Sequence, residues 1–82
     1  MHYLLTLALK EEPLAIEQVL QTVRYRGFRV HSVDLSLHRG QYQMYVEVYG
    51  LTAIENLIQQ INKLYDVTSL TFEATASLEQ TA

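Results

Sequence analysis

The stretch RYRGFRVHSV, residues 24–33, marks the point where the hydrophobic pattern of the chain changes its period. Upstream of it, apolar residues recur at the spacing of a helix with one buried face. These residues are Ile16, Val19, Leu20 and Val23. Downstream, from Phe28, apolar and polar residues alternate as in a strand. Gly27 lies at the change, and glycine readily takes the left-handed conformation that ends a helix. The stretch therefore predicts a helix-to-strand junction at Gly27.

A strand and the start of the helix precede this junction. Residues 3–9 are apolar on one face and mostly apolar on the other, which is typical of a central strand. The first face carries Tyr3, Leu5, Leu7 and Leu9, and the second carries Leu4, Thr6 and Ala8. Pro13 stands where the first turn of a helix tolerates proline, so we expect the helix to begin there.

A hairpin follows the junction. The apolar parity switches after Val30, which predicts a bulge or a change of covered face. The apolar residues on the two sides of the switch are Phe28 and Val30, then Val33, Leu35 and Leu37. The letters HRGQ at 38–41 indicate a turn around Gly40. In the returning strand, Tyr45 and Tyr49 fall on the face that we expect to be exposed.

The last third of the chain predicts a second helix and a final strand. Thr52 and Glu55 have the spacing of a capping box, in which the two residues bond each other's backbone at a helix start. The helix that follows has apolar residues at Ile54, Leu57, Ile58, Ile61 and Leu64. Residues 67–74 predict a strand, and residues 75–82 a flexible polar tail.

The predicted order is βαββαβ. Two such βαβ halves fold most simply into one four-stranded sheet with two helices on one face, the ferredoxin-like plait, an α+β fold. We expect a single domain over residues 1–74. Because this fold serves many unrelated functions, function has to come from the site residues.

Composition narrows the class of protein. The net charge of −3 provides no overall attraction for nucleic acid or for an anionic membrane. The chain has no cysteine, which excludes disulfides and thiolate catalysis and suits a cytoplasmic protein. No segment approaches the roughly 20 apolar residues that span a bilayer, so we expect a soluble protein. A domain this small has a limited core, and we expect it to gain stability as an oligomer.

Catalytic and metal-binding constellations are not evident in the sequence. His2, His31 and His38 are scattered, without helical pairing or a cysteine, so we predict no metal site. His31 and Ser32 are neighbours on a strand, so their side chains should point to opposite faces and cannot act as base and nucleophile. We therefore predict no catalytic residue and no cofactor-binding residue in this chain.

Two kinds of binding module remain open at this point. RGFRVHSV is superficially similar to an RNA-recognition motif, but Val30 and Val33 stand where stacking aromatics are needed. The acidic balance also disfavours RNA. The alternative is a protein-binding module, since Tyr45, Tyr49 and Leu4 leave an unusually apolar second face on the sheet.

Two runs of sequence resemble one family. The runs VLQTVRYRGFRVHSVDLSL, 19–37, and LIQQINKLYDV, 57–67, are similar to the small regulatory subunit of acetolactate synthase, closest to the isozyme II type. In the second run the residues that carry the resemblance are Gln60, Asn62, Lys63, Leu64, Asp66 and Val67. That family is built on a single ACT domain, which has the ferredoxin-like fold.

The resemblance implies a non-catalytic subunit for branched-chain amino-acid biosynthesis. Such a subunit binds a large catalytic subunit and raises its activity, and thiamine diphosphate, magnesium and FAD belong to that large chain. The reaction joins the two-carbon fragment of one decarboxylated pyruvate to a second 2-oxoacid. The resemblance also implies a homodimer formed through the ACT domain, with no nucleic acid or membrane as partner.

The resemblance also identifies a candidate effector loop at Glu11, Pro13 and Leu14. Valine-sensing members of the family carry N-x-x-G-V-L here, and alignment back from RGF puts Glu11 at the asparagine and Leu14 at the glycine. A branched side chain obstructs the close approach of an effector, and a carboxylate repels the effector's own carboxylate. We therefore predict a degenerate loop and a valine-insensitive protein. Alternatively, Leu14 is a core residue of the first helical turn.

The candidate partner interface comprises Arg24, Arg26, Arg29, Tyr45 and Tyr49. The arginines either contact the large subunit or are solvated cations at a helix end. The tyrosines form a homodimer face, form a large-subunit face, or cover one another within the sheet. A free-standing ACT-type amino-acid sensor is the alternative to a regulatory subunit, and it requires a working effector loop.

Overall fold

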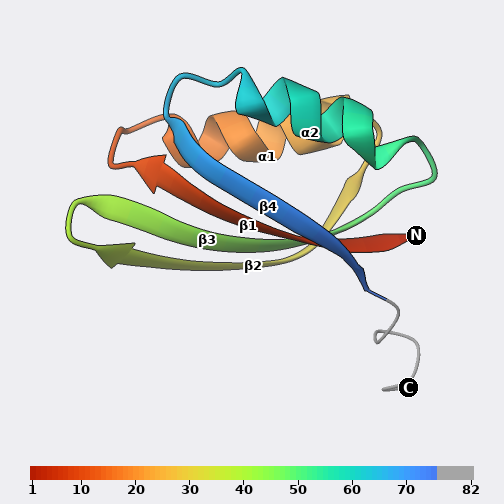
Figure 1. Cartoon of the computed structure of the whole chain (residues 1–82), viewed down its shortest axis with the longest axis horizontal. Coiled ribbons are helices and arrows are strands. Elements are labelled where there is room, and N and C mark those ends of the chain that lie inside the picture. Colours follow the sequence, from red (N-terminus) through yellow and green to blue (C-terminus); the bar gives the residue numbers. More distant parts are fainter. Residues whose placement is uncertain (76–82) are drawn as a thin grey trace.

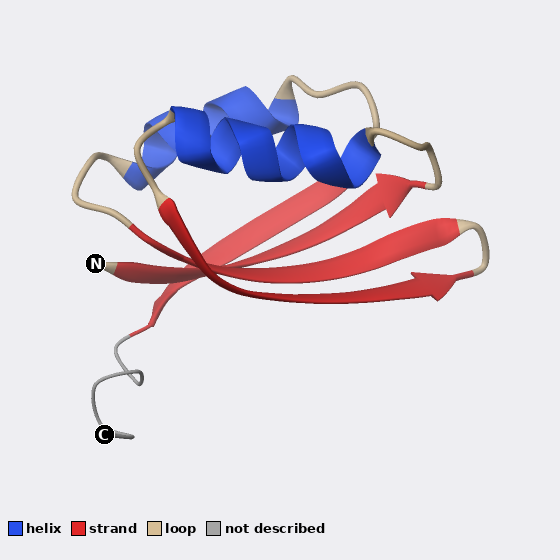
Figure 2. Ribbon diagram, turned by 180° about the vertical axis from the view of Figure 1, so that it is seen from behind, coloured by secondary structure: helices blue, strands red, loops and turns tan. Residues whose placement is uncertain are grey.

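Six elements follow one another in the order βαββαβ in a computed structural model that describes residues 1–75 (Figure 1). The strands are β1 (His2–Lys10), β2 (Arg29–His38), β3 (Gln41–Tyr49) and β4 (Val67–Thr75), and the helices are α1 (Ala15–Tyr25) and α2 (Ile54–Asn62). The sheet order is β2-β3-β1-β4, with every neighbouring pair antiparallel. Both helices cover the same face (Figure 2). The ferredoxin-like plait is confirmed, with β1 as a central strand.

The core lies between the helices and the covered face of the sheet. On β1, Leu5, Leu7 and Leu9 are fully buried or nearly so, and they pair with Val46, Met44 and Tyr42 of β3. The helices contribute the apolar faces predicted from their spacing, and their fully buried residues are Val19, Val23, Leu57 and Ile61. Opposite residues of an antiparallel pair share a face, so the other face of the sheet carries the alternate residues, Leu4 and Thr6 among them. We call this second face the open face.

The RGF stretch forms the junction that its sequence predicts. Helix α1 ends at Tyr25, and Gly27 follows with a positive φ of 88°. The Gly27 N–H donates to the Arg24 carbonyl at 3.0 Å, and the Phe28 N–H to the Val23 carbonyl at 3.1 Å. This pair of bonds is the Schellman motif, in which the last carbonyls of the helix find donors. Phe28 then enters the core with 2% exposure.

Strand β2 contains the predicted bulge. Its register with β3 shifts between Val30 and Ser32, which leaves His31 as the extra residue. Beyond the bulge, Val33 and Leu35 lie opposite the buried Val46 and Met44, so they face the helix side of the sheet. They are nevertheless exposed, because β2 is an edge strand and the β2–β3 hairpin extends past the ends of both helices (Figures 1 and 2).

Both predicted helix starts need correction. Helix α1 begins at Ala15, and Pro13 lies in the preceding turn, where the Ala15 N–H donates to the Glu12 carbonyl at 3.1 Å. Helix α2 begins at Ile54, with Ala53 as its N-cap and no side-chain capping bond. The capping box is therefore wrong: the helix starts one residue later than the box requires. The Thr52 hydroxyl instead donates to the Arg26 carbonyl at 3.4 Å.

The last strand ends one residue later than its sequence predicts. Strand β4 continues through Thr75 instead of ending at 74. The rest of the predicted tail, residues 76–82, lies outside the described residues. Within residues 1–75, no helix is both long enough and apolar enough to cross a membrane.

Candidate functional site

The candidate effector loop is a short, exposed turn between β1 and α1. The Glu12 N–H donates to the Lys10 carbonyl at 2.8 Å, and the Lys10 N–H donates to the Asp66 carbonyl at 2.8 Å, which ties the loop to the start of β4. Glu11 and Pro13 are exposed. Leu14 is 58% exposed, so the alternative that it is a core residue is wrong. The loop therefore presents its side chains to solvent.

Leu14 takes the N-cap position of α1 with an ordinary backbone. Its φ is −104°, which any residue adopts, and its carbonyl accepts the Gln18 N–H at 2.9 Å. Glycine is thus not needed here for the fold of the backbone. Any obstruction that Leu14 presents to an effector comes from its side chain alone.

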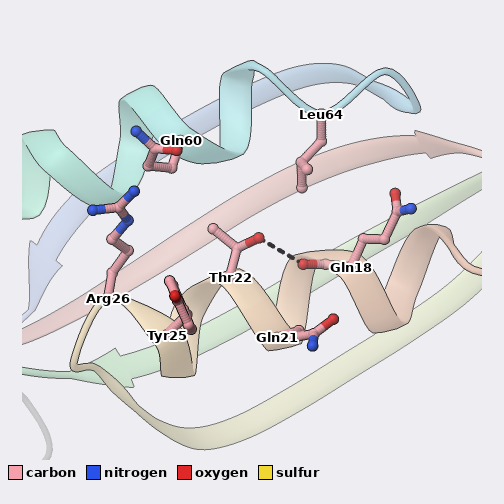
Figure 3. A pocket seen from close by; sticks show the side chains of 7 residues that line it. All are labelled: Gln18, Gln21, Thr22, Tyr25, Arg26, Gln60 and Leu64. Atoms are coloured by element: carbon pink, nitrogen blue, oxygen red, sulfur yellow. Dashed lines mark hydrogen bonds between the residues drawn. The ribbon is translucent and has the colours of Figure 1, made fainter.

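The three candidate arginines are all exposed but do not form one patch. Arg24 lies in the last turn of α1, and Arg26 follows as its C-cap. Figure 3 shows the Arg26 side chain reaching from α1 towards Gln60 of α2. Arg29 begins β2 and pairs with Tyr49, which places it on the open face. Arg26 and Arg29 therefore serve different surfaces.

The two candidate tyrosines lie on the open face, as predicted. Tyr45 pairs with Thr6 and is 44% exposed, and Tyr49 pairs with His2 and is 38% exposed. They are four residues apart on β3, a separation of about 13 Å along a strand, so they cannot cover one another. Tyr49 instead packs on the His2 ring, with a centroid distance of 4.8 Å. Tyr45 is left as an exposed aromatic near the middle of the face.

The bulge changes the expected arrangement of His31 and Ser32. Their side chains were predicted on opposite faces, but the His31 ring lies 6.4 Å from that of His2, which is on the open face with Ser32. The extra residue of a bulge loses the regular alternation, which is the physical reason for the difference. The Ser32 hydroxyl donates to the Glu47 carboxylate at 2.8 Å. This serine is therefore bonded to an acceptor and not to a histidine base.

A small hollow at the start of β2 brings two of the candidate interface residues together. Arg29 and Tyr49 line it at the end of the sheet where α1 gives way to β2, with a volume of about 200 Å³. Gly50 also lines it, and a Cβ at this position would lie within 2.8 Å of three ring carbons of Phe28. Glycine is required at 50 by this close approach.

A groove of about 400 Å³ runs between the outer sides of the two helices (Figure 3). Of the described residues, Arg26 is the one charged residue that lines it. The rest of its lining consists of Gln18, Gln21, Thr22 and Tyr25 from α1, and Gln60 and Leu64 from the α2 region. Carboxamides both donate and accept hydrogen bonds, so the groove suits a polar segment with peptide groups of its own.

The groove was not identified from the sequence, although a signal for it exists. Gln18, Thr22 and Arg26 recur every four residues, which aligns them on one side of α1. The Thr22 hydroxyl donates to the Gln18 carbonyl at 2.8 Å, which fixes part of this stripe. The stripe lies beside the apolar face and resembles an ordinary solvated surface, so its pairing with Gln60 becomes visible only in three dimensions.

The described part of the chain contains no cluster of side chains suited to bind a metal ion. Within residues 1–75, no group of three or more histidine, cysteine, aspartate or glutamate side chains comes close enough to hold an ion. The features that the structure does assemble are surfaces: the loop, the open face and the groove.

The family is identified by a sequence profile. The ACT domain profile matches residues 11–70, which run from the candidate effector loop to the middle of β4. The chain belongs to the ACT domain family. No curated protein matches it by sequence. An ACT domain is a regulatory module without catalytic residues of its own.

Solved structures share the fold at low sequence identity. The ACT domain of GTP pyrophosphokinase from Chlorobium tepidum matches with a TM-score of 0.76 and 8% identity, over 89% of this chain and 97% of that domain. An acetolactate synthase small subunit from Thermotoga maritima matches with a TM-score of 0.73 and 24% identity, over 87% of this chain and 46% of that one. A formyltetrahydrofolate deformylase from Burkholderia mallei matches with a TM-score of 0.74 and 9% identity, over 88% of this chain and 27% of the deformylase. This chain therefore spans about half of the small subunit and about a quarter of the deformylase.

Proposed function

We propose that this ACT domain is the non-catalytic small subunit of an acetolactate synthase, which binds the large catalytic subunit and raises its activity in branched-chain amino-acid biosynthesis in the cytoplasm. The observation that carries the proposal is where the two family-like runs lie in the fold. Residues 19–37 and 57–67 are far apart in sequence, yet they supply six of the seven residues that line the groove between the helices. Two runs that resemble one family and meet on one surface favour a shared binding role.

The groove is a candidate contact for the large subunit. Its carboxamides and the Arg26 guanidinium can bond a polar or acidic segment of a partner, and Tyr25, which is 84% exposed, adds an aromatic side chain at its rim. Arg24 lies on the same helix, one turn or less away. In this proposal the small subunit favours an active arrangement of its partner by binding that arrangement more tightly.

Thiamine diphosphate, magnesium and FAD belong to the large subunit in this proposal. They would carry out the chemistry there, and this chain would contribute no catalytic residue and hold no cofactor. Its contribution would be binding energy alone, expressed as a change in the partner's rate.

Valine insensitivity is part of the proposal and rests on the effector loop. In the family pattern, Glu11 stands in place of an asparagine and Leu14 in place of a glycine. The backbone at Leu14 is unstrained, so this position accepts a residue with a side chain. An amino-acid effector would meet the Leu14 side chain and the Glu11 carboxylate, which repels its own carboxylate.

The decisive test is acetolactate formation from pyruvate by the large subunit of the same source, with this chain omitted or titrated in. A saturable rise in rate that valine leaves unchanged supports the proposal. A rise that valine reverses keeps the regulatory role and refutes the interpretation of Glu11 and Leu14. No rise and no co-purification of the two subunits refutes the role as an acetolactate synthase subunit and leaves an ACT domain with another partner.

Variants of the arginines test the proposed contact. Replacing Arg24, Arg26 and Arg29 together with glutamine should weaken complex formation, whereas Arg39→Gln in the β2–β3 turn is the matched control and should leave it unchanged. Unchanged complex formation by the triple variant would exclude these cations from the interface.

The effector loop can be tested in the same complex. Glu11→Asn combined with Leu14→Gly should introduce valine binding, measured by calorimetry. No gain in binding would mean that something other than these two side chains closes the loop to an effector. A free-standing amino-acid sensor is the second candidate, favoured by the ACT fold itself. Tight binding of an amino acid by the unmodified chain, without any large subunit, would support that candidate.

A further inference from the structure

Arg26 reaches into the groove between the helices without a partner of its own. Its side chain extends away from the end of α1 towards Gln60 of α2 (Figure 3). The guanidinium has no hydrogen bond or ion pair to any of residues 1–75. A guanidinium carries five donors in a planar fork, which fits the two oxygens of a carboxylate. Arg26 is therefore free to bind an anionic group that enters the groove.

The end of α1 does not need the Arg26 guanidinium as a cap. Cations near the C-terminus of a helix often interact with its last carbonyls. Here the Thr22, Val23 and Arg24 carbonyls accept backbone N–H groups at 3.0, 3.1 and 3.0 Å. The Arg26 carbonyl accepts the Thr52 hydroxyl at 3.4 Å. Because these carbonyls are already bonded, capping does not account for the position of the guanidinium.

The charge of the groove is opposite to that of the whole chain. The chain has a net charge of −3, which disfavours an acidic partner over most of its surface. Within residues 1–75, the lining of the groove contains Arg26 and no aspartate or glutamate. Arg24 is not part of the lining, since residues two apart on a helix do not share a side. Charge complementarity thus favours a segment whose carboxylate meets Arg26.

The other end of the groove is apolar. Leu64 lines it there, at the end away from Arg26 (Figure 3). The Leu64 N–H donates to the Ile61 carbonyl at 3.0 Å, and the Val67 N–H donates to the Leu64 carbonyl at 3.2 Å, so the backbone fixes this position. The side chain is half-buried and keeps part of its surface for a ligand. Gln18 and Arg26 mark the length of the groove on α1, about 12 Å for eight residues of helix.

We propose that the groove binds an extended segment of the large subunit, which places a carboxylate on Arg26 and, four residues away, an apolar side chain on Leu64. This proposal deepens the proposed function and rests on it for the identity of the partner. Four residues of extended chain span about 13 Å, which matches the length of the groove. Of the three candidate arginines, Arg26 is then the one that bonds this segment.

The carboxamides between the two ends favour an extended segment over a helix. The peptide groups of a helix bond one another, whereas an extended segment offers a free N–H and C=O at each residue. Gln18, Gln21 and Gln60 can donate to such a carbonyl and accept from such an N–H. The Thr22 hydroxyl donates to the Gln18 carbonyl at 2.8 Å, so its oxygen can still accept a hydrogen bond.

A second copy of this chain is a poorer occupant of the groove. Two copies related by a twofold axis present the same surface to each other. Grooves that meet in this way bring the two Arg26 guanidinium groups to one interface without a carboxylate in either lining. Like charges at an interface repel one another. The groove therefore favours a different protein chain as its partner.

Matched arginine variants test the contact in the complex. Arg26→Gln should raise the concentration of this chain that half-activates the large subunit by about tenfold or more, because it removes a charge-assisted pair of hydrogen bonds. Arg24→Gln removes the same charge from the same helix end, outside the groove, and should change this concentration by less than about twofold. Circular dichroism checks that both exposed positions tolerate the change. Equal effects of the two substitutions would refute the contact.

A peptide probe tests the chemistry of the groove without the large subunit. The probe is acetyl-Asp-Gln-Ser-Gln-Leu-amide, used in both sequence orders at millimolar concentration with the full chain. In nuclear magnetic resonance titrations, one order should shift the side-chain amide signals of Gln18, Gln21 and Gln60. Gln59, which is exposed outside the groove, is the matched control and should not respond. Asn in place of Asp, or Ser in place of Leu, should weaken binding at least about threefold.

The two assays separate failure of the inference from failure of the proposed function. Activation with equal effects of Arg24→Gln and Arg26→Gln keeps the proposed function and refutes the inference. A chain that does not activate the large subunit but binds the probe refutes the proposed function and supports the chemistry assigned to the groove. Groove signals that change when residues 76–82 are removed would identify that segment as the occupant, and signals that change with protein concentration would identify a second copy. Either result overturns the inference, as does the absence of any response to the probe.

Discussion

Gly50→Ala should destabilise the domain by about 2 kcal/mol, although it adds a single methyl group. A Cβ at this position would lie within 2.8 Å of three ring carbons of Phe28, whereas carbon atoms in good contact are roughly 3.5–4.0 Å apart. The ring would have to move by about 1 Å, and with 2% exposure it has no free space around it. Overpacking of this kind costs about 1–3 kcal/mol.

Urea unfolding followed by circular dichroism measures this loss. A domain of this length has a total stability of about 4–12 kcal/mol, so a loss of 2 kcal/mol shifts the midpoint clearly while leaving the slope unchanged. Phe28→Leu removes the ring atoms that the new methyl group meets. In that background Gly50→Ala should cost less than about 1 kcal/mol, which gives a coupling energy of at least about 1 kcal/mol.

Gly40→Ala provides the matched control. Gly40 has a positive φ of 78° but no atom within 4 Å of an added Cβ, so its substitution costs backbone strain alone, about 1–2 kcal/mol. That cost should be the same with Phe28 or leucine at position 28. Additive effects for Gly50→Ala and Phe28→Leu would refute the steric explanation, as would a loss below about 0.5 kcal/mol for Gly50→Ala alone.

Substitutions at three further sites test local features of the fold by the same unfolding measurement. Gly27→Ala should cost about 1–2 kcal/mol, because Gly27 has a φ of +88° and an added Cβ meets no atom within 4 Å. Gly27→Asn should cost less, since asparagine tolerates this conformation. Equal losses for the two variants would contradict a purely backbone cause. Thr52→Ala should cost less than about 0.5 kcal/mol, because the Thr52 hydroxyl does not cap α2. A loss of about 1 kcal/mol, which is typical of a lost N-cap, would support the capping box after all. Tyr65→Leu should cost about 0.5 kcal/mol, because it removes the cation–π contact with Lys10, whose Nζ lies 3.8 Å from the ring centroid. Lys10→Met removes the same contact. In that background Tyr65→Leu should cause no further loss of stability.

The sequence predicts the fold well because its strongest signals are local. Gly27 ends a helix through bonds to carbonyls only a few residues away, and the change of period on its two sides reports which face each element buries. The bulge after Val30 is visible as a switch of parity in the same way. The capping box misleads for the converse reason: Thr52 and Glu55 have the right spacing, but the Arg26 carbonyl offers the hydroxyl a partner from another part of the chain.

The candidate functional surfaces are less visible in the sequence because they combine distant residues. Gln18 and Gln60 lie on separate helices and meet only across the groove, so no spacing rule connects them. The apolar residues of β2 show a second limit of prediction from sequence. Their alternation predicts a strand with a buried face, but burial depends on how far the helices reach, and the hairpin extends past them. An alternating pattern therefore predicts which face of a strand is apolar, but not whether the rest of the fold covers that face.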